Sequence, residues 1–225
     1  MKRNNITKGL SILFFTVSIL DIIGVAFGNL LLEAIFKPMI IISLMILYYY
    51  SSEKKNNWFL LALAFSFLGD VLLLDKEGLF LFGIAAFLMT QLIYIGLILK
   101  RINKTTVQQN VLAVLPFLVY ITFLIMLLKD NLGEYLIPVI VYALTIAIFG
   151  IVSLLNYLKY KTRSAQLLLI GAVLFIVSDS MIALNKFYEP RDFYPVAIMV
   201  TYVLAQLIIM RSMVVYESED DKPVG

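Results

Sequence analysis

Residues 135–158 of the chain read YLIPVIVYALTIAIFGIVSLLNYL, a stretch without a charged side chain. An α-helix needs about 20 apolar residues to cross the hydrocarbon core of a bilayer, because each residue advances it by only about 1.5 Å. The stretch therefore predicts a membrane-spanning helix. Seven further apolar runs predict seven more spanning helices, at residues 10–27, 34–50, 58–74, 79–99, 111–128, 165–184 and 194–215.

The composition of the whole chain agrees with a membrane protein. Hydrophobic residues make up 62% of the 225 residues and charged residues 15%, whereas a soluble domain is roughly half apolar and a quarter charged. The connectors between the runs are short and polar, so we expect one all-α bundle of eight transmembrane helices over residues 1–216. The acidic residues 217–225 are expected to form a disordered tail. No small-residue cleavage site follows the first run, which we interpret as a retained helix.

The residue types that are missing restrict the chemistry. The chain has no cysteine and no histidine. Disulfides, cysteine nucleophiles, Ser-His-Asp triads and zinc sites built from Cys or His are therefore excluded. The net charge is only +3, with the basic residues in short clusters between apolar runs, so nucleic-acid binding is not indicated.

The distribution of Lys and Arg predicts the orientation in the membrane. The N-terminus, the second, fourth and sixth connectors and the C-terminus hold 13 of the 18 Lys and Arg residues. Cytoplasmic loops of membrane proteins carry an excess of these residues. We therefore expect both termini to be cytoplasmic, in an integral protein of the plasma membrane (the inner membrane of a bacterium).

Two acidic residues fall inside predicted spans, where ionisable groups are costly and usually functional. Asp70 lies late in the third span and Asp179 late in the seventh, so the expected topology places both in the outer half of the bilayer. Asp21, Glu33 and Lys37 come out at the same end. The alternative is that Asp70 and Asp179 are structural, each bonded to a Tyr, Ser or Gln across helices.

Helical spacing adds neutral partners for these acids, because residues four apart share one face of a helix. The pairs are Ser66 with Asp70, Thr90 with Tyr94, and Tyr202 with Gln206, while Gln91 is next to Thr90 and Lys186 follows Asp179 by seven residues. Together they predict a polar site that faces outward. Lys37 is either a ligand in this site or a side chain that snorkels to the interface.

The two acidic stretches also resemble each other. Residues 67–72, FLGDVL, are echoed by residues 177–182, VSDSMI, and each stretch is followed by a helix with Thr, Gln and Tyr. The two stretches lie in the third and the seventh predicted helix, which are four apart in order, so both run in the same direction. This pattern predicts a parallel four-plus-four repeat.

At these residues the sequence resembles the lysoplasmalogenase family, the YhhN and TMEM86 group of integral membrane proteins. The first half of the resemblance lies in FSFLGDVLL (65–73) and FGIAAF (82–87), leading to Gln91 and Tyr94. The second half lies in GAVLFIVSDS (171–180), ALNKF (183–187), Thr201-Tyr202 and Ala205-Gln206. Lys37-Pro38 matches a Lys-Pro at the second helix of the family. The resemblance covers about residues 30–210.

The resemblance implies an eight-helix membrane enzyme that hydrolyses the vinyl ether bond of lysoplasmalogens. The products are a fatty aldehyde and a glycerophospho-base such as glycerophosphoethanolamine. Asp70 and Asp179 are then the catalytic acid and base. The implied substrate-binding residues are Lys37, Ser66, Gln91, Tyr94, Asn185, Lys186, Tyr202 and Gln206. The partner is a lysophospholipid in the bilayer, and neither a metal nor a cofactor is expected.

This reaction suits a site made of carboxylates. A vinyl ether is protonated at carbon, water attacks the oxocarbenium ion, and the hemiacetal collapses. Two carboxylates in different surroundings can supply the proton donor, the charge stabiliser and the base, as in glycoside hydrolysis. Two alternatives stay open: a multi-helix transporter, which usually has helices broken by Gly or Pro near mid-membrane, and a non-catalytic lipid-binding protein.

Overall fold

The chain folds into a bundle of α-helices. The computed structural model describes residues 2–75 and 77–219, and these ranges contain eight α-helices and no strand. The helices are α1 (Lys2–Ala26), α2 (Leu30–Ser51), α3 (Asn57–Leu72), α4 (Phe80–Leu99), α5 (Val107–Leu128), α6 (Leu136–Tyr160), α7 (Arg163–Phe187) and α8 (Tyr194–Glu219). Each predicted run corresponds to one helix, so the all-α, eight-helix architecture is confirmed.

Side-chain caps fix where several helices begin. Asn29 accepts hydrogen bonds from the backbone N–H groups of Leu31 and Leu32, which satisfies donors that the first turn of a helix leaves unpaired. Asn56 caps α3 and Thr106 caps α5 in the same way. Because of the Asn29 cap, α2 begins four residues before the predicted run 34–50.

The early start of α2 changes the place of Pro38. The predicted run 34–50 puts Lys37 and Pro38 close to the start of the second helix, whereas Pro38 lies well inside α2. Pro116 likewise lies inside α5. Both helices continue past their proline, so neither shows the break near mid-membrane that a transporter would usually have.

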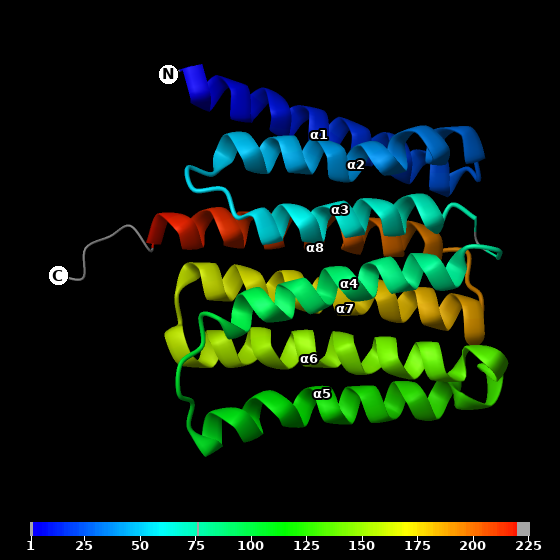
Figure 1. Cartoon of the computed structure of the whole chain (residues 1–225). Coiled ribbons are helices and arrows are strands. Elements are labelled where there is room, and N and C mark those ends of the chain that lie inside the picture. The colour runs from blue at the N-terminus through cyan, green and yellow to red at the C-terminus, as the bar shows by residue number, and fades with distance from the viewer. Residues whose placement is uncertain (1, 76, 220–225) are drawn as a thin grey trace.

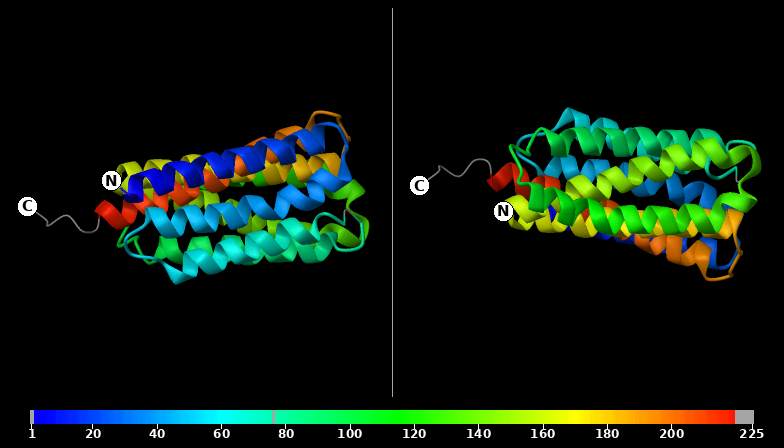
Figure 2. Two further views of the ribbon diagram at one scale, coloured as in Figure 1. Left: turned by 90° about the horizontal axis from the view of Figure 1, so that it is seen from above. Right: turned by 90° about the horizontal axis from the view of Figure 1, so that it is seen from below.

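Both ends of the described chain lie at the same end of the bundle (Figure 1). The connectors α2–α3, α4–α5 and α6–α7 lie at this end, and the connectors α1–α2, α3–α4, α5–α6 and α7–α8 lie at the other. The helix axes are roughly aligned with one another, and successive helices run in opposite directions (Figure 2). Seven of them are long and apolar enough to cross a membrane. The remaining helix, α3, has only 16 residues, which is about 24 Å of helix. It also runs between the two ends of the bundle.

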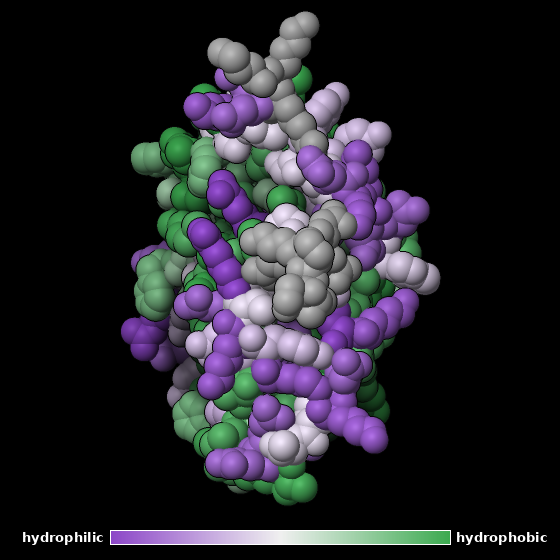
Figure 3. Space-filling model, turned by 90° about the vertical axis from the view of Figure 1, so that its left-hand side faces the viewer, coloured by the Kyte–Doolittle hydropathy of each residue, from purple (hydrophilic) through white to green (hydrophobic). Residues whose placement is uncertain are grey.

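Hydrophilic side chains gather on the end face that carries the termini (Figure 3). The sides of the bundle expose large apolar side chains, among them Ile12, Leu118, Val119, Phe123 and Met126. Such a belt requires lipid around it, because water would leave this apolar area unburied. The chain is an integral membrane protein.

The pairs of packed helices repeat between the two halves of the chain. The pairs α1–α2, α3–α4 and α2–α3 have their equivalents in α5–α6, α7–α8 and α6–α7. The contact of α4 with α6 across the halves has its equivalent in that of α8 with α2. This packing agrees with the parallel four-plus-four repeat.

Close approach of α7 to α8 depends on a glycine. A Cβ atom built on Gly171 would lie 2.6 Å from the side chain of Ile209 and 3.2 Å from the backbone oxygen of Ala205. A larger residue would therefore push α8 away. Small residues serve this purpose in many membrane helix pairs, because apolar lipid gives helices no hydrophobic reason to associate.

The last described turn of α8 is tied to α2. Glu217 accepts hydrogen bonds from the hydroxyl groups of Tyr48 (2.6 Å) and Ser52. The predicted tail, 217–225, thus begins inside the helix, which ends at Glu219. Residues 220–225 lie outside the described residues.

The arrangement predicts opposite locations for the connectors that contain Glu77 and Asn103. Reporter fusions placed at these two residues should report opposite sides of the membrane, because the α3–α4 and α4–α5 connectors lie at opposite ends of the bundle. The measurement is the activity of a pair of reporters, one active in each compartment. Reports from the same side would contradict a spanning α4.

Candidate functional site

Asp70 is held on α3 by a neighbour from α8. Its carboxylate accepts a hydrogen bond from the Tyr202 hydroxyl at 2.8 Å, and both side chains are almost fully buried. Lys37 of α2 lies close enough to interact electrostatically with Asp70. The acid therefore has a phenol on one side and an ammonium group on the other.

A network of neutral groups continues from Tyr202 toward the terminal end of the bundle. The side-chain nitrogen of Gln206 donates to Ser66 Oγ at 3.0 Å, and its side-chain oxygen accepts from the Tyr94 hydroxyl at 3.1 Å. Ser66 in turn donates to Thr90 at 3.2 Å. These bonds join α3, α4 and α8 through fully buried groups, as the four-residue spacing predicted for the individual helices.

Asp179 of α7 has different partners. It accepts hydrogen bonds from the hydroxyl of Tyr142 on α6 and, at 3.1 Å, from the side-chain nitrogen of Gln91 on α4. Gln91 also donates to the Tyr142 hydroxyl at 2.8 Å, so the three groups form a closed triangle. Within the described part of the chain, these partners of the Asp179 carboxylate are a phenol and an amide, both neutral.

The two acids occupy equivalent places in the repeat. Asp70 on α3 faces α8 and α2, and Asp179 on α7 faces α4 and α6. Helices α3 and α2 of the first site correspond to α7 and α6 of the second, four places later in the chain. Helix α8 has the role at the first site that α4 has at the second. The repeat therefore builds two similar carboxylate sites, of which the first faces a lysine and the second a tyrosine.

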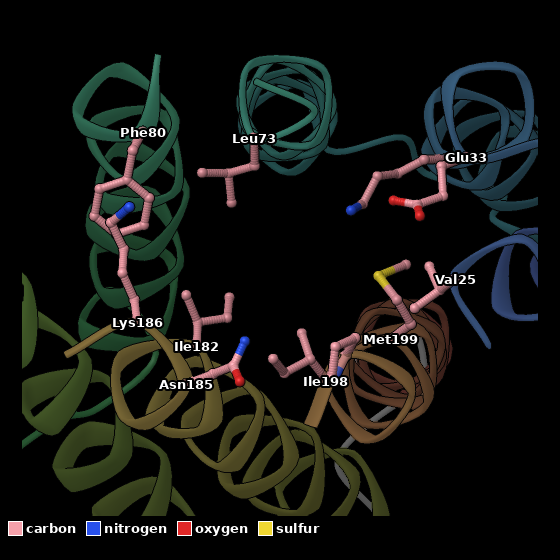
Figure 4. A pocket seen from close by; sticks show the side chains of 11 residues that line it. Val25, Glu33, Leu73, Phe80, Ile182, Asn185, Lys186, Ile198 and Met199 are labelled. Atoms are coloured by element: carbon pink, nitrogen blue, oxygen red, sulfur yellow. The ribbon is translucent and has the colours of Figure 1, made fainter. Parts of the chain in front are cut away.

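The outer pocket lies at the end of the bundle away from the termini. It has a volume of about 240 Å³. Figure 4 shows Glu33 pointing into it from α2 and, from the far side, Asn185 and Lys186 of α7. Lys37 also lines this pocket. The lining residues that remain are apolar: Val25, Leu73, Phe80, Ile182, Pro195, Ile198 and Met199.

Two narrow apolar clefts lead from this pocket into the bundle. The first, about 40 Å³, shares Leu73, Phe80 and Ile182 with the outer pocket. The second, about 30 Å³, adjoins α5 and shares Tyr142 and Asp179 with the first. Asp179 thus lines both clefts, and the lining residues that neighbouring cavities share place them in a row from the outer pocket toward α5. Asp70 lines neither the outer pocket nor these clefts.

The structure therefore divides the predicted site residues into three groups. Ser66, Tyr94, Tyr202 and Gln206 gather around Asp70, Gln91 pairs with Asp179, and Lys37, Asn185 and Lys186 line the outer pocket. Among the described residues, the two carboxylates have different hydrogen-bond partners, and Asp70 does not line the clefts that Asp179 lines. Arg191 lies outside the pocket and pairs with Glu189 at 2.8 Å.

Sequence reasoning missed Tyr142. Its hydroxyl is the partner of Asp179, but it occurs in the apolar run 135–158 without any neighbouring polar motif. The one available signal was a phenol near the middle of a spanning helix, where a buried hydroxyl needs a partner.

The sequence profile of the YhhN family, applied to the chain, matches residues 32–213, a range that contains both carboxylate sites and most of the outer pocket. The chain belongs to the YhhN family. This membership agrees with the resemblance inferred from the motifs around Asp70 and Asp179. No solved structure matches the chain significantly.

Three curated relatives illustrate what this member of the YhhN family is similar to. Lysoplasmalogenase TMEM86A of Bos taurus is 27% identical over 165 residues, covering 68% of this chain and 63% of the relative. Lysoplasmalogenase of Mycobacterium bovis is 31% identical over 157 residues, covering 68% and 58%. Lysoplasmalogenase TMEM86B of Mus musculus is 31% identical over 157 residues, covering 67% and 61%. The match thus spans less than two thirds of each relative.

The buried network around Asp70 should respond strongly to the loss of Gln206. Gln206→Met keeps the length of the side chain but removes the hydrogen bonds of Gln206 to Ser66 and Tyr94. Loss of a hydrogen bond by a buried polar group costs about 1–3 kcal/mol. We expect a lower unfolding temperature in detergent, measured by intrinsic fluorescence. Gln108→Met, at an exposed position of α5, is the control and should unfold like the unchanged protein.

Proposed function

We propose that this chain hydrolyses the vinyl ether bond of lysoplasmalogens, releasing a fatty aldehyde and a glycerophospho-base. The observation that carries the proposal is the position of Asp179, which lies on the clefts that continue inward from the outer pocket. The names of the YhhN relatives support the same activity.

The shape and polarity of the pocket suit a single-chain phospholipid. Its head group would occupy the outer pocket beside Lys186, and its alkenyl chain would follow the apolar clefts toward α5. Seven residues of α7 separate Asp179 from Lys186, about 10.5 Å along the helix. In a lysoplasmalogen, the glycerol backbone separates the vinyl ether oxygen from the phosphate. The Lys186 side chain covers the rest of the distance between Asp179 and Lys186 along α7.

The two carboxylates would divide the reaction between them. Asp179 transfers a proton to the alkene carbon farther from the ether oxygen, which leaves an oxocarbenium ion at the carbon bonded to oxygen. Asp70 lines neither the outer pocket nor the clefts. It would stabilise this positive charge and take a proton from the attacking water once substrate binding brings its site, with Lys37 and Tyr202, into contact with the clefts. The hemiacetal then breaks its bond to the glycerol oxygen, which receives a proton, and the aldehyde leaves. Two acids with different neighbours can perform these complementary steps.

The proposed orientation puts both termini in the cytoplasm and the outer pocket in the outer half of the plasma membrane. It is supported by the excess of Lys and Arg in the N-terminus and in the α2–α3, α4–α5 and α6–α7 connectors. Lysophospholipids of the outer leaflet would then reach the site laterally.

The first test replaces each acid separately. Asp179→Asn and Asp70→Asn keep the shape of the side chain and remove the group that exchanges a proton. We expect each to lower kcat by roughly 10²–10⁴-fold, as for the loss of a general acid or base. The assay follows aldehyde release from lysoplasmalogen by the purified protein.

The outcome separates catalysis from structure. A variant that unfolds at a lower temperature and turns over normally in the folded fraction would give that acid a structural role. Full activity in both variants would contradict the two-carboxylate mechanism. If the unchanged protein releases no aldehyde from lysoplasmalogen, the proposed function itself is wrong.

The second test concerns the phosphate. Lys186→Met should raise KM more than it lowers kcat, because a charge-assisted hydrogen bond to the phosphate is lost in the ground state and the transition state alike. Lys37→Met should lower kcat more, because Lys37 also faces Asp70. Arg191→Met, which changes an exposed residue paired with Glu189, is the matched control. An unchanged KM in Lys186→Met would return this lysine to a snorkelling role.

A further inference from the structure

A second open cavity lies at the opposite end of the bundle from the outer pocket. Its volume is about 250 Å³, and it is lined by one residue of α3 and five of α4: Trp58, Leu92, Ile93, Gly96, Leu97 and Lys100. The start of α3 and the end of α4 both lie at the end of the bundle that carries the termini (Figure 1). We call this cavity the α3–α4 groove.

The groove owes its depth to a glycine. Leu92, Gly96 and Lys100 are four residues apart, so they follow one face of α4. A Cβ atom built on Gly96 would meet no atom within 4 Å. The missing side chain therefore leaves open space on the surface, whereas Gly171 serves a close helix contact. From Leu92 to Lys100 this face is about 12 Å long, which suits the upper part of an extended acyl chain.

The two ends of the groove differ in polarity. Toward the middle of the bundle, the groove is lined by aliphatic side chains. Toward the terminal end it has the exposed side chains of Trp58 and Lys100, with the Lys100 ammonium 5.7 Å from the centre of the Trp58 ring. Tryptophan and lysine are typical of the level of the lipid head groups in membrane proteins. The groove therefore has the polarity of a phospholipid, with a polar end and an apolar length.

The charge at the polar end of the groove favours an anion. None of the described residues that line the groove is acidic. The connector that follows α4, residues 100–106, contains Lys100, Arg101 and Lys104 and no acid. Basic residues next to a spanning helix attract anionic lipids. A lysine ammonium has three N–H donors, so it can bind a phosphate while it also lies over an aromatic ring.

We propose that the α3–α4 groove binds an anionic phospholipid from the leaflet at the terminal end of the bundle. Its acyl chain lies against Gly96, and its head group lies against Lys100 and Trp58. The bound lipid is a component of the bilayer rather than a substrate, since neither Asp70 nor Asp179 lines the groove. The site is therefore separate from the outer pocket and independent of the proposed hydrolysis.

A second copy of the chain fits the groove less well than a lipid does. Glycine can bring two membrane helices together, so a dimer through α4 is the natural alternative. A two-fold axis along the membrane normal would place the two α4 helices side by side in the same direction. The two Lys100 ammonium groups would then repel each other, with no acidic side chain lining the described groove. A lipid phosphate instead neutralises this charge.

The chain contains its own probe for the groove, because Trp58 is its only tryptophan. The purified full-length protein is placed in bilayers of phosphatidylcholine that contain rising fractions of a lipid brominated on its acyl chains. Bromine quenches the fluorescence of a tryptophan that it contacts. Brominated phosphatidylglycerol, which is anionic, should quench Trp58 at an about fivefold lower fraction than brominated phosphatidylcholine, the effect of one lysine near the membrane surface.

Two variants test the two parts of the site. Lys100→Gln should bring the quenching curves of the two lipids together, because the cation is lost. Gly96→Leu should weaken quenching by both lipids, because the new side chain fills the space of the acyl chain.

Matched controls are available for both variants. Lys104→Gln changes an exposed lysine of the same connector. Gly9→Leu changes an exposed glycine of α1, where an added Cβ also meets no atom within 4 Å. Both controls should retain the fivefold difference between the two lipids.

The contrary results are equally specific. Equal quenching by both lipids in the unchanged protein, or unchanged quenching in Gly96→Leu, would overturn the inference. A preference that survives in Lys100→Gln, or that is lost equally in Lys104→Gln, would assign it to the overall charge of this end of the bundle. A dimer in detergent that Gly96→Leu separates would assign the groove to a second copy of the chain. The measurement involves no aldehyde release, so each of these outcomes leaves the proposed function untouched.

Discussion

Hydrocarbon offers a polar side chain no water to bond with, so each buried polar group must find its partner on a neighbouring helix. In this protein that requirement joins helices distant in sequence. Tyr202 of α8 bonds Asp70 of α3, and Gln91 of α4 bonds Asp179 of α7. Apolar packing between helices has little preference for one rotation over another in lipid. The interhelical hydrogen bonds therefore specify which face of each helix turns inward, and the pockets follow from that choice.

The repeat gives the bundle two carboxylate sites and then makes them unequal. Asp70 faces the ammonium group of Lys37, whereas the partners of Asp179 are a phenol and an amide. An enzyme that must give a proton at one step and take one at another benefits from acids in unlike surroundings. The clefts reach Asp179 and not Asp70, which adds a difference in access to the difference in charge.

The outer pocket and the clefts beside it combine charged and apolar groups. The charged groups lie at the end of the bundle, where a head group meets water, and the apolar clefts continue inward, where a hydrocarbon chain belongs. The acids Asp21 and Glu33 lie on α1 and α2, outside the two equivalent carboxylate sites. Helix α2 thus contributes Glu33 and Lys37 to the outer pocket, while Asp70 and Asp179 have their partners on α2, α4, α6 and α8.

The sequence alone determined the eight helices, because apolar length and the need to satisfy every backbone group leave lipid-embedded segments hardly any other form. It also identified Asp70, Asp179, Tyr202, Gln206 and Gln91 as special, because polar groups are rare in such runs. It could not find Tyr142 as the partner of Asp179, nor show that the two acids lie in separate sites. Spacing along a helix tells which residues share a face, but which neighbour that face meets depends on the rotation and packing of all the helices. Only the tertiary structure decided that, by the hydrogen bonds the buried groups could make.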